Sequence, residues 1–125
     1  MDATADKPRV LVVDDEQVIA NTLTQILNQR GLNAKAAYSG ETAIEVATDL
    51  RPDILISDVA MHGINGVDVA IAVTRGTPKC RVVLFSGQAA TADLLRRAED
   101  AGYRFEILAK PVHPRTLLTL LRRSN

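Results

Sequence analysis

Residues 10–15 read Val-Leu-Val-Val-Asp-Asp, a run of four apolar residues that ends in two carboxylates. Such a run, rich in β-branched side chains, indicates a strand that is buried on both faces. Similar runs occur at residues 54–56 and 82–85, and weaker ones at residues 34–38 and 105–109. The sequence therefore predicts five short strands.

The segments between these runs have helical spacing. Ile19, Leu23 and Leu27 repeat on one helix face, and Gly31 follows where a glycine typically ends a helix. A last helix begins at Pro114 and runs to Arg123. Three more segments have the same periodicity, and they centre on residues 43–47, 69–73 and 94–98.

Five strands that alternate with five helices predict an α/β fold with right-handed crossovers. We expect one doubly wound, five-stranded parallel sheet of flavodoxin-like order 2-1-3-4-5, with helices on both faces. No repeat or Pro-rich linker divides the 125 residues. We therefore predict a single domain, 1–125, with its core at about 9–122 and frayed ends at 1–7 and 124–125.

Composition narrows the function classes. Hydrophobic residues make up 46% of the chain and charged residues 24%, as in folded globular domains. Fifteen basic residues balance fifteen acidic ones, so we expect no direct nucleic-acid partner. There is no apolar run of membrane-spanning length and no signal-peptide pattern, and Cys80 is the single cysteine. These features favour a cytoplasmic protein without a membrane partner.

Polar residues follow four of the predicted strands. They are Asp14 and Asp15, then Asp58, then Ser86 with Gly87, and finally Lys110 with Pro111. Ligands of open parallel sheets bind beyond the carboxyl ends of the strands, so we expect these residues to gather there. Three carboxylates beside one ammonium would leave about two uncompensated negative charges, and a divalent cation would remove their repulsion. The pattern predicts Mg²⁺, with Asp15 and Asp58 as ligands.

Each of these residues also has a structural interpretation. Asp14 and Asp15 can be a helix cap and a first-turn acid, Asp58 and Ser86 can be turn residues, and Lys110 can be a surface charge. Capping alone would not require a lysine after the fifth strand. The coincidence at four strand ends therefore favours a functional site.

Several short motifs, taken in order, resemble the receiver domain of bacterial two-component response regulators. They span about residues 9–122: VLVVDDE at 10–16, SGE at 39–41, DILISDVAMHGING at 53–66, LFSG at 84–87, and Lys110 with Pro111. The resemblance implies a phosphorylation-dependent switch rather than a separate enzyme. A sensor histidine kinase or phosphotransfer protein would be the phosphoryl donor.

The resemblance also implies individual roles. Asp58 would accept the phosphoryl group, Lys110 would pair with its oxygens, and the Ser86 hydroxyl would bond one of them. Asp15, Asp58 and the backbone carbonyl of Ala60 would hold Mg²⁺, with Asp14 acting largely through a bound water. The bond before Pro111 would be cis, and a downstream protein would dock on the face from the fourth strand to the fifth helix.

The sequence departs from the family pattern at two notable places. His62 stands where the family usually has proline, and Ile107 stands where many members carry an aromatic switch residue. We expect Ile107 to be buried on its strand. His62 and His113 are far apart and have no Cys or His at ligand spacing, so we expect no zinc site. His113 fits the start of the last helix, and Cys80 fits a structural thiol.

Three alternative functions are disfavoured by residues of the same segments. An aspartyl-phosphate phosphatase of the haloacid dehalogenase type needs a second Asp two residues after the nucleophile, where this chain has Ala60. A flavin carrier would need a phosphate-binding loop after the first strand, where Asp14 and Asp15 stand. A degenerate receiver that only binds partners is disfavoured by the complete acidic set and Lys110. The six arginines after residue 95 are interpreted as solvated.

Overall fold

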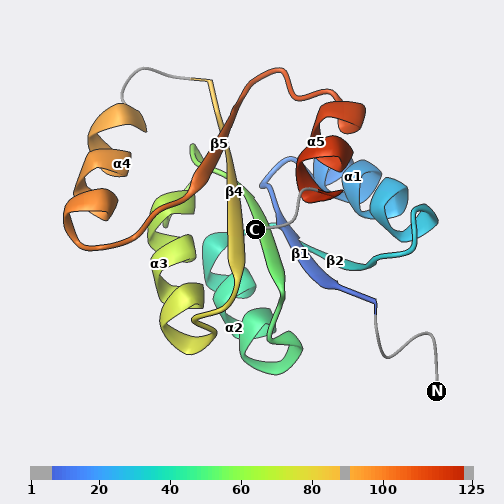
Figure 1. Ribbon diagram of the computed structural model, residues 1–125, viewed down its shortest axis with the longest axis horizontal. Coiled ribbons are helices and arrows are strands. Elements are labelled where there is room, and N and C mark those ends of the chain that lie inside the picture. Colours follow the sequence, from blue (N-terminus) through green and yellow to red (C-terminus); the bar gives the residue numbers. More distant parts are fainter. Residues whose placement is uncertain (1–6, 88–90, 123–125) are drawn as a thin grey trace.

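The computed structural model describes residues 7–87 and 91–122, so most of the predicted frayed ends lie outside the described residues. Five parallel strands form one sheet in the order β2-β1-β3-β4-β5 (Figure 1). The predicted topology is confirmed. The strands are β1 (Arg9–Val13), β2 (Asn33–Ala37), β3 (Ile54–Asp58), β4 (Arg81–Ser86) and β5 (Glu106–Ala109).

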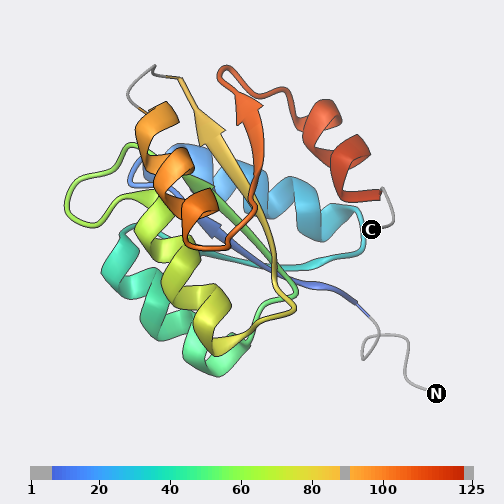
Figure 2. The same ribbon diagram turned by 60° about the vertical axis from the view of Figure 1, so that its left-hand side comes forward.

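Helices cover both faces of the sheet. They are α1 (Gln17–Gln29), α2 (Gly40–Leu50), α3 (Gly66–Gly76), α4 (Thr91–Asp100) and α5 (Pro114–Arg122). Figures 1 and 2 show α1 and α5 on one face and α2, α3 and α4 on the other. Two hydrophobic clusters fill these layers, one under each set of helices. None of the helices within residues 7–87 and 91–122 is long and apolar enough to cross a membrane.

Burial separates the central strands from the edge strands. All five residues of β3 are buried, as are four each in β1 and β4. In β5, the edge strand beside β4, residues alternate between half-buried and exposed. Ile107 is 40% exposed, so the expectation that it would be buried is wrong. The reason is its position on an edge strand, where every second side chain points to a face that remains open.

Local sequence signals explain where the helices begin and end. Ser39 and Asn65 are N-caps, and each side chain accepts a hydrogen bond from a backbone N–H in the first turn of its helix. After α1, Gly31 has a φ of 91° and donates its N–H to the carbonyl of Asn28. The predicted glycine at this helix end is thereby confirmed.

The amino ends of β4 and β5 are tied to the last helix by one side chain. Arg81 forms an ion pair with Glu106, at 2.6 Å between Nε and Oε2, and also donates to the carbonyls of Leu120 and Leu121. The guanidinium thereby satisfies carbonyls at the end of α5. This contact holds α5 beside the sheet, far along the chain from β4.

Candidate functional site

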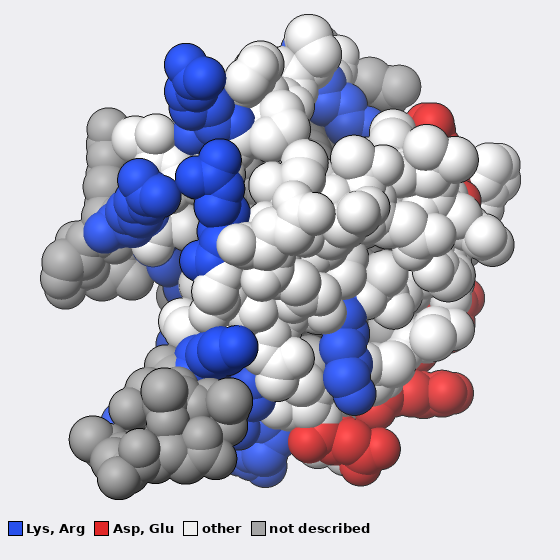
Figure 3. Space-filling model, turned by 90° about the vertical axis from the view of Figure 1, so that its right-hand side faces the viewer, with Lys and Arg blue, Asp and Glu red and all other residues white. Residues whose placement is uncertain are grey.

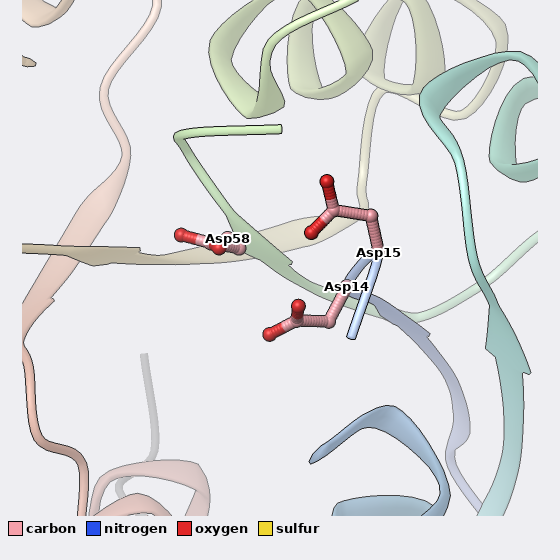
Figure 4. Close-up of side chains that lie close together, drawn as sticks. All are labelled: Asp14, Asp15 and Asp58. Atoms are coloured by element: carbon pink, nitrogen blue, oxygen red, sulfur yellow. The ribbon is translucent and has the colours of Figure 1, made fainter. Parts of the chain in front are cut away.

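Three carboxylates meet at the carboxyl edge of the sheet, where the strand order reverses between β1 and β3. Asp14 and Asp15 follow β1, and Asp58 ends β3. One carboxylate oxygen of each lies within 4.8 Å of the others. Figure 4 shows the three side chains gathered beyond the two strand ends. The predicted acidic cluster is therefore assembled.

Backbone hydrogen bonds hold the strand ends that carry the site. The N–H of Asp14 donates to Ala37 O at 3.1 Å, which extends the pairing of β1 with β2. On the other side, the N–H of Lys110 donates to Ser86 O at 3.0 Å, which extends the pairing of β4 with β5. The site residues thus directly follow hydrogen-bonded strands of one continuous sheet, so their backbone positions are held rigidly.

Lys110 supplies the positive charge of the site. Its Nζ lies 2.8 Å from Oδ1 of Asp58, whose side chain is only 6% exposed. The stem of Lys110 passes Gly87, where an added Cβ would meet it at 3.5 Å. The Lys110–Pro111 bond is cis, as the resemblance implied. A lysine more than 50 residues from Asp58 in sequence is thus its direct partner.

Asp14 is the most deeply placed carboxylate, with 2% of its surface exposed. Its Oδ1 accepts a hydrogen bond from the N–H of Glu16 at 2.9 Å. Burial, and to a smaller extent the charge of Asp58, raise the pKa of Asp14 above 3.8. The N-cap of α1 is Glu16, without a side-chain capping bond, so the capping interpretation of Asp14 and Asp15 does not hold.

Asp15 has a partner that the strand pattern did not reveal. Both the N–H and the ring Nδ1 of His62 contact Oδ2 of Asp15, at 3.1 and 2.9 Å. Hydrogen bonds from the His62 ring and backbone hold the pKa of Asp15 below 3.8. His62 lies 47 residues away, in the loop after β3. The one sequence signal that pointed to His62 was its occurrence at a position where the family usually has proline.

The loop after β3 can take its path only because Gly66 has no side chain. An added Cβ on Gly66 would overlap the carbonyl oxygen of Asp58 and come within 2.9 Å of Val59 Cα, so α3 can begin here only without a side chain. The N–H of Gly66 donates to Val59 O at 2.9 Å. Ala60, Met61 and His62 of this loop line an open hollow of about 590 Å³ together with Asp15, Asp58 and Lys110.

The remaining predicted residues are placed as follows. Ser86 is the last residue of β4 and is half-buried next to the site. Cys80 is a buried free thiol, and burial raises its pKa to about 12, as expected for a structural cysteine. The Nδ1 of His113 accepts the N–H of Arg115 at the start of α5. Among the described arginines beyond residue 95, all are exposed.

The donor set suits a divalent cation. Three clustered carboxylates and one ammonium leave a surplus of negative charge when all are ionised, and the carboxylates offer the oxygen ligands that Mg²⁺ prefers. Ala60 lines the same hollow as Asp15 and Asp58. The residues therefore fit the cation that the sequence predicted.

Comparison with known proteins agrees with this geometry. The family model for the response regulator receiver domain matches residues 10–122. The DNA-binding response regulator MtrA of Mycobacterium tuberculosis is 29% identical over 116 residues, which are 93% of this chain and 50% of MtrA. The autoinducer 1 sensor kinase/phosphatase LuxN of Vibrio campbellii is 34% identical over 87 residues, 70% of this chain and 10% of LuxN.

A solved structure supports the same assignment of fold. A CheY-like receiver domain protein from Methanospirillum hungatei superposes with a TM-score of 0.84 at 21% identity, over 94% of this chain and 92% of that one. The fold and the acidic site thus define a phosphorylation switch of the two-component type. The chain belongs to the response regulator receiver domain family. It spans about half the length of MtrA.

Membership in the receiver domain family decides between the receiver function and its alternatives. The phosphatase and flavin alternatives are not favoured, and Ala60 offers no second acid beside Asp58. The assembled carboxylates and Lys110 also argue against a receiver that has lost its chemistry.

Proposed function

We propose that Asp58 is the phosphoryl acceptor of this receiver domain and that a phosphohistidine of a sensor kinase or phosphotransfer protein is the donor. The observation that carries the proposal is the 2.8 Å pair between Asp58 Oδ1 and Lys110 Nζ inside a cluster of carboxylates. Phosphoryl transfer depends mainly on positioning and charge neutralisation, and this arrangement supplies both.

In the transfer, an Asp58 oxygen forms the new bond to phosphorus while the bond from phosphorus to the donor imidazole nitrogen breaks. The electron pair of that bond stays on the imidazole, which takes up a proton from solvent. The Lys110 ammonium lies where it can neutralise charge on the phosphoryl oxygens. Ser86 lies at the neighbouring strand end, and we propose that its hydroxyl bonds one of these oxygens afterwards.

Asp15, Asp58 and the carbonyl of Ala60 are the proposed ligands of Mg²⁺, with Asp14 acting through a bound water. When bound, the cation supplies positive charge for the phosphoryl oxygens. The ammonium of Lys110 holds Oδ1 of Asp58, and the backbone N–H of His62 orients Asp15. The chain is proposed to catalyse only its own phosphoryl transfer and the loss of that group.

The donor is proposed to dock against α1. This helix has no charged residue in 13 positions, and Val18 is 78% exposed on it. A hollow of about 600 Å³ lies between α1 and the segment after β5, and both Asp14 and Lys110 line it. Figure 3, turned toward the side that carries α1 and α5, shows a broad uncharged area with Lys and Arg gathered along one side.

The output partner is proposed to bind the face from β4 to α5. That face carries exposed arginines on α4 and α5 and the exposed Ile107 of β5. The partner is a protein in this proposal, and we place the reaction in the cytoplasm, where kinases of this type obtain ATP. Cys80 is a free thiol, in keeping with a reducing compartment.

Incubation with acetyl phosphate and Mg²⁺ followed by intact-mass spectrometry tests the proposal. One added phosphoryl group is expected in the wild type and in Asp53→Asn, and none in Asp58→Asn or in excess chelator. Asp53 is a matched control because it lies at the opposite end of β3, paired with Arg9. An adduct of equal yield in Asp58→Asn would refute the assignment.

A further inference from the structure

Two residues of β5 turn their backbone hydrogen-bonding groups away from the sheet. β4 and β5 are parallel, and the N–H of Lys110 donates to Ser86 O. Alternate residues of a parallel strand bond the same neighbour, so Leu108 faces β4 as Lys110 does, whereas Ile107 and Ala109 face away from β4. β5 is the last strand of the sheet, and Figure 2 shows it between α4 and α5. The N–H and C=O groups of Ile107 and Ala109 therefore lie on its outer side, the side away from β4.

The strand at the other end of the sheet, β2, has its outer side closed by a side chain. Asn28 of α1 donates from Nδ2 to Ala34 O at 3.2 Å, and its Oδ1 accepts the N–H of Ala34 at 2.7 Å. The exposed Lys35 also places a charge on β2, which is a common protection of outermost strands. In the part of the chain that the structure describes, the outward groups of β5 have no such side-chain partner. The two ends of the sheet thus differ, and the end at β5 is open to a further strand.

The side chains on the two faces of β5 suit an extended segment that alternates apolar and acidic residues. On one face, Ile107 is 40% exposed. On the other face, Leu108 and Arg115 line a hollow of about 370 Å³ between β5 and α5. Successive side chains of an added strand point to opposite faces. Apolar residues of such a strand can therefore lie beside Ile107 while its acidic residues point toward Arg115.

Charge favours an acidic partner over a second copy of this chain. Arg115 and Arg104, which precedes β5, are exposed and have no ion pair with any described residue. Glu106, the acid of β5, is already paired with Arg81 at 2.6 Å. Pairing of two copies through β5 would bring four such arginines to one interface, where like charges repel. An acidic segment would neutralise them instead.

We propose that the output partner adds an extended acidic segment to the outer side of β5, as a further strand of the sheet. Backbone hydrogen bonds supply the affinity of this contact, and alternate side chains supply its specificity. The inference rests on the proposed function for the existence of an output partner on this face, and it names how that partner binds. β5 ends at Ala109, directly before Lys110, so the added strand lies next to the residue that pairs with Asp58.

Fluorescence anisotropy with a labelled short peptide of alternating valine and glutamate tests the proposal on the full chain. Two further peptides carry N-methyl groups on alternate nitrogens, one on its valines and the other on its glutamates. Only one of these two sets of N–H groups faces β5 in an added strand. One methylated peptide should therefore bind like the parent, and the other should lose about fivefold in affinity for each hydrogen bond removed. Equal affinities of the two methylated peptides would overturn strand addition.

A charge reversal tests the acidic character of the partner. Arg115→Glu should weaken binding of the parent peptide about fivefold, as expected for the loss of an exposed ion pair. Lys79→Glu is the matched control, because Lys79 is an exposed cation between α3 and β4, and this variant should bind the peptide like the wild type. An equal loss in both variants would show a general charge effect and would contradict a site at β5.

Hydrogen exchange of backbone amides, followed by NMR, reads the proposed contact directly. In the free chain, the amides of Ile107 and Ala109 should exchange faster than that of Leu108, which is bonded to β4. Saturating peptide should slow exchange at Ile107 and Ala109 by about tenfold or more. Exchange at Ala36 should not change, because it faces the outer side of β2.

The outcomes separate this inference from the proposed function. Absence of saturable peptide binding, or binding without slower exchange at Ile107 and Ala109, overturns the docking mode. Self-association of the chain in sedimentation with slow exchange at these two amides, before any peptide is added, assigns the outer side of β5 to a second copy and also overturns it. Phosphorylation of Asp58 by acetyl phosphate should be equal in the wild type and Arg115→Glu, so its failure would count against the proposed function alone.

Discussion

The pair between Lys110 and Asp58 predicts a measurable coupling between the two side chains in the metal-free protein. Lys110→Met removes the charge but keeps a stem of similar length against Gly87. The change leaves Asp58, which is 6% exposed, among carboxylates without its ammonium. We therefore expect Lys110→Met to destabilise the wild type far more than it destabilises Asp58→Asn.

The magnitude follows from distance and exposure. Unit charges at the observed 2.8 Å attract by about 6 kcal/mol at an effective dielectric of 20 and by about 1.5 kcal/mol in bulk water. Lys110 is 35% exposed, which weakens the attraction, and desolvation offsets part of the rest. A coupling of about 2 kcal/mol is expected, which lies between the values for exposed and for buried pairs.

Urea denaturation of the wild type, the two single variants and the double variant in chelator measures this coupling. For 125 residues, about 2 kcal/mol corresponds to a shift in Tm of roughly 8 °C. Lys79→Met is the control, since Lys79 is exposed and should stay within about 0.5 kcal/mol of the wild type. A coupling below about 0.5 kcal/mol would refute the reasoning, because the pair would then be fully screened.

Two further predictions concern stability. Asp14→Asn should stabilise the metal-free protein at pH 7, because burial raises the pKa of Asp14 and its ionisation opposes folding above that pKa. The gain should vanish below pH 3.8, where this carboxyl is protonated in the folded and unfolded states alike, and a gain that persists there in urea titrations would contradict this cause. Gly66→Ala should cost about 3 kcal/mol or more and reduce phosphorylation of Asp58, because the new Cβ overlaps the Asp58 carbonyl. Gly76→Ala, in the same helix with nothing within 4 Å of its Cβ, should be neutral or slightly stabilising, because Ala favours helix more than Gly does. An equal loss in both variants would contradict the steric cause.

Much of the fold can be read from local patterns. The apolar run at residues 10–13 and its counterparts at 54–56 and 82–85 predict central strands, because a strand covered on both faces needs apolar residues at every position. The glycine at 31 and the proline at 114 mark helix ends for reasons of backbone conformation. These signals act within a few residues, so they are visible in a single sequence.

The acidic cluster was also predictable, although its partners were only partly so. Parallel topology brings the residues after β1 and β3 to one edge, so Asp14, Asp15 and Asp58 had to lie near one another once the strand order was known. Lys110 follows β5 by the same rule, and its pairing with Asp58 is a long-range contact that the pattern made plausible. Strand periodicity does not predict which carboxylate oxygen Lys110 contacts.

The sequence by itself thus determined the strands, the helices, their order and the edge on which the charged residues gather. Only the tertiary structure decided that Ile107 is exposed, because its surroundings depend on what covers an edge strand rather than on its own side chain. Only the structure placed His62 on Asp15, across 47 residues, and showed that Gly66 must lack a side chain. Those features depend on the path of one loop in space, and side-chain periodicity carries no information about that path.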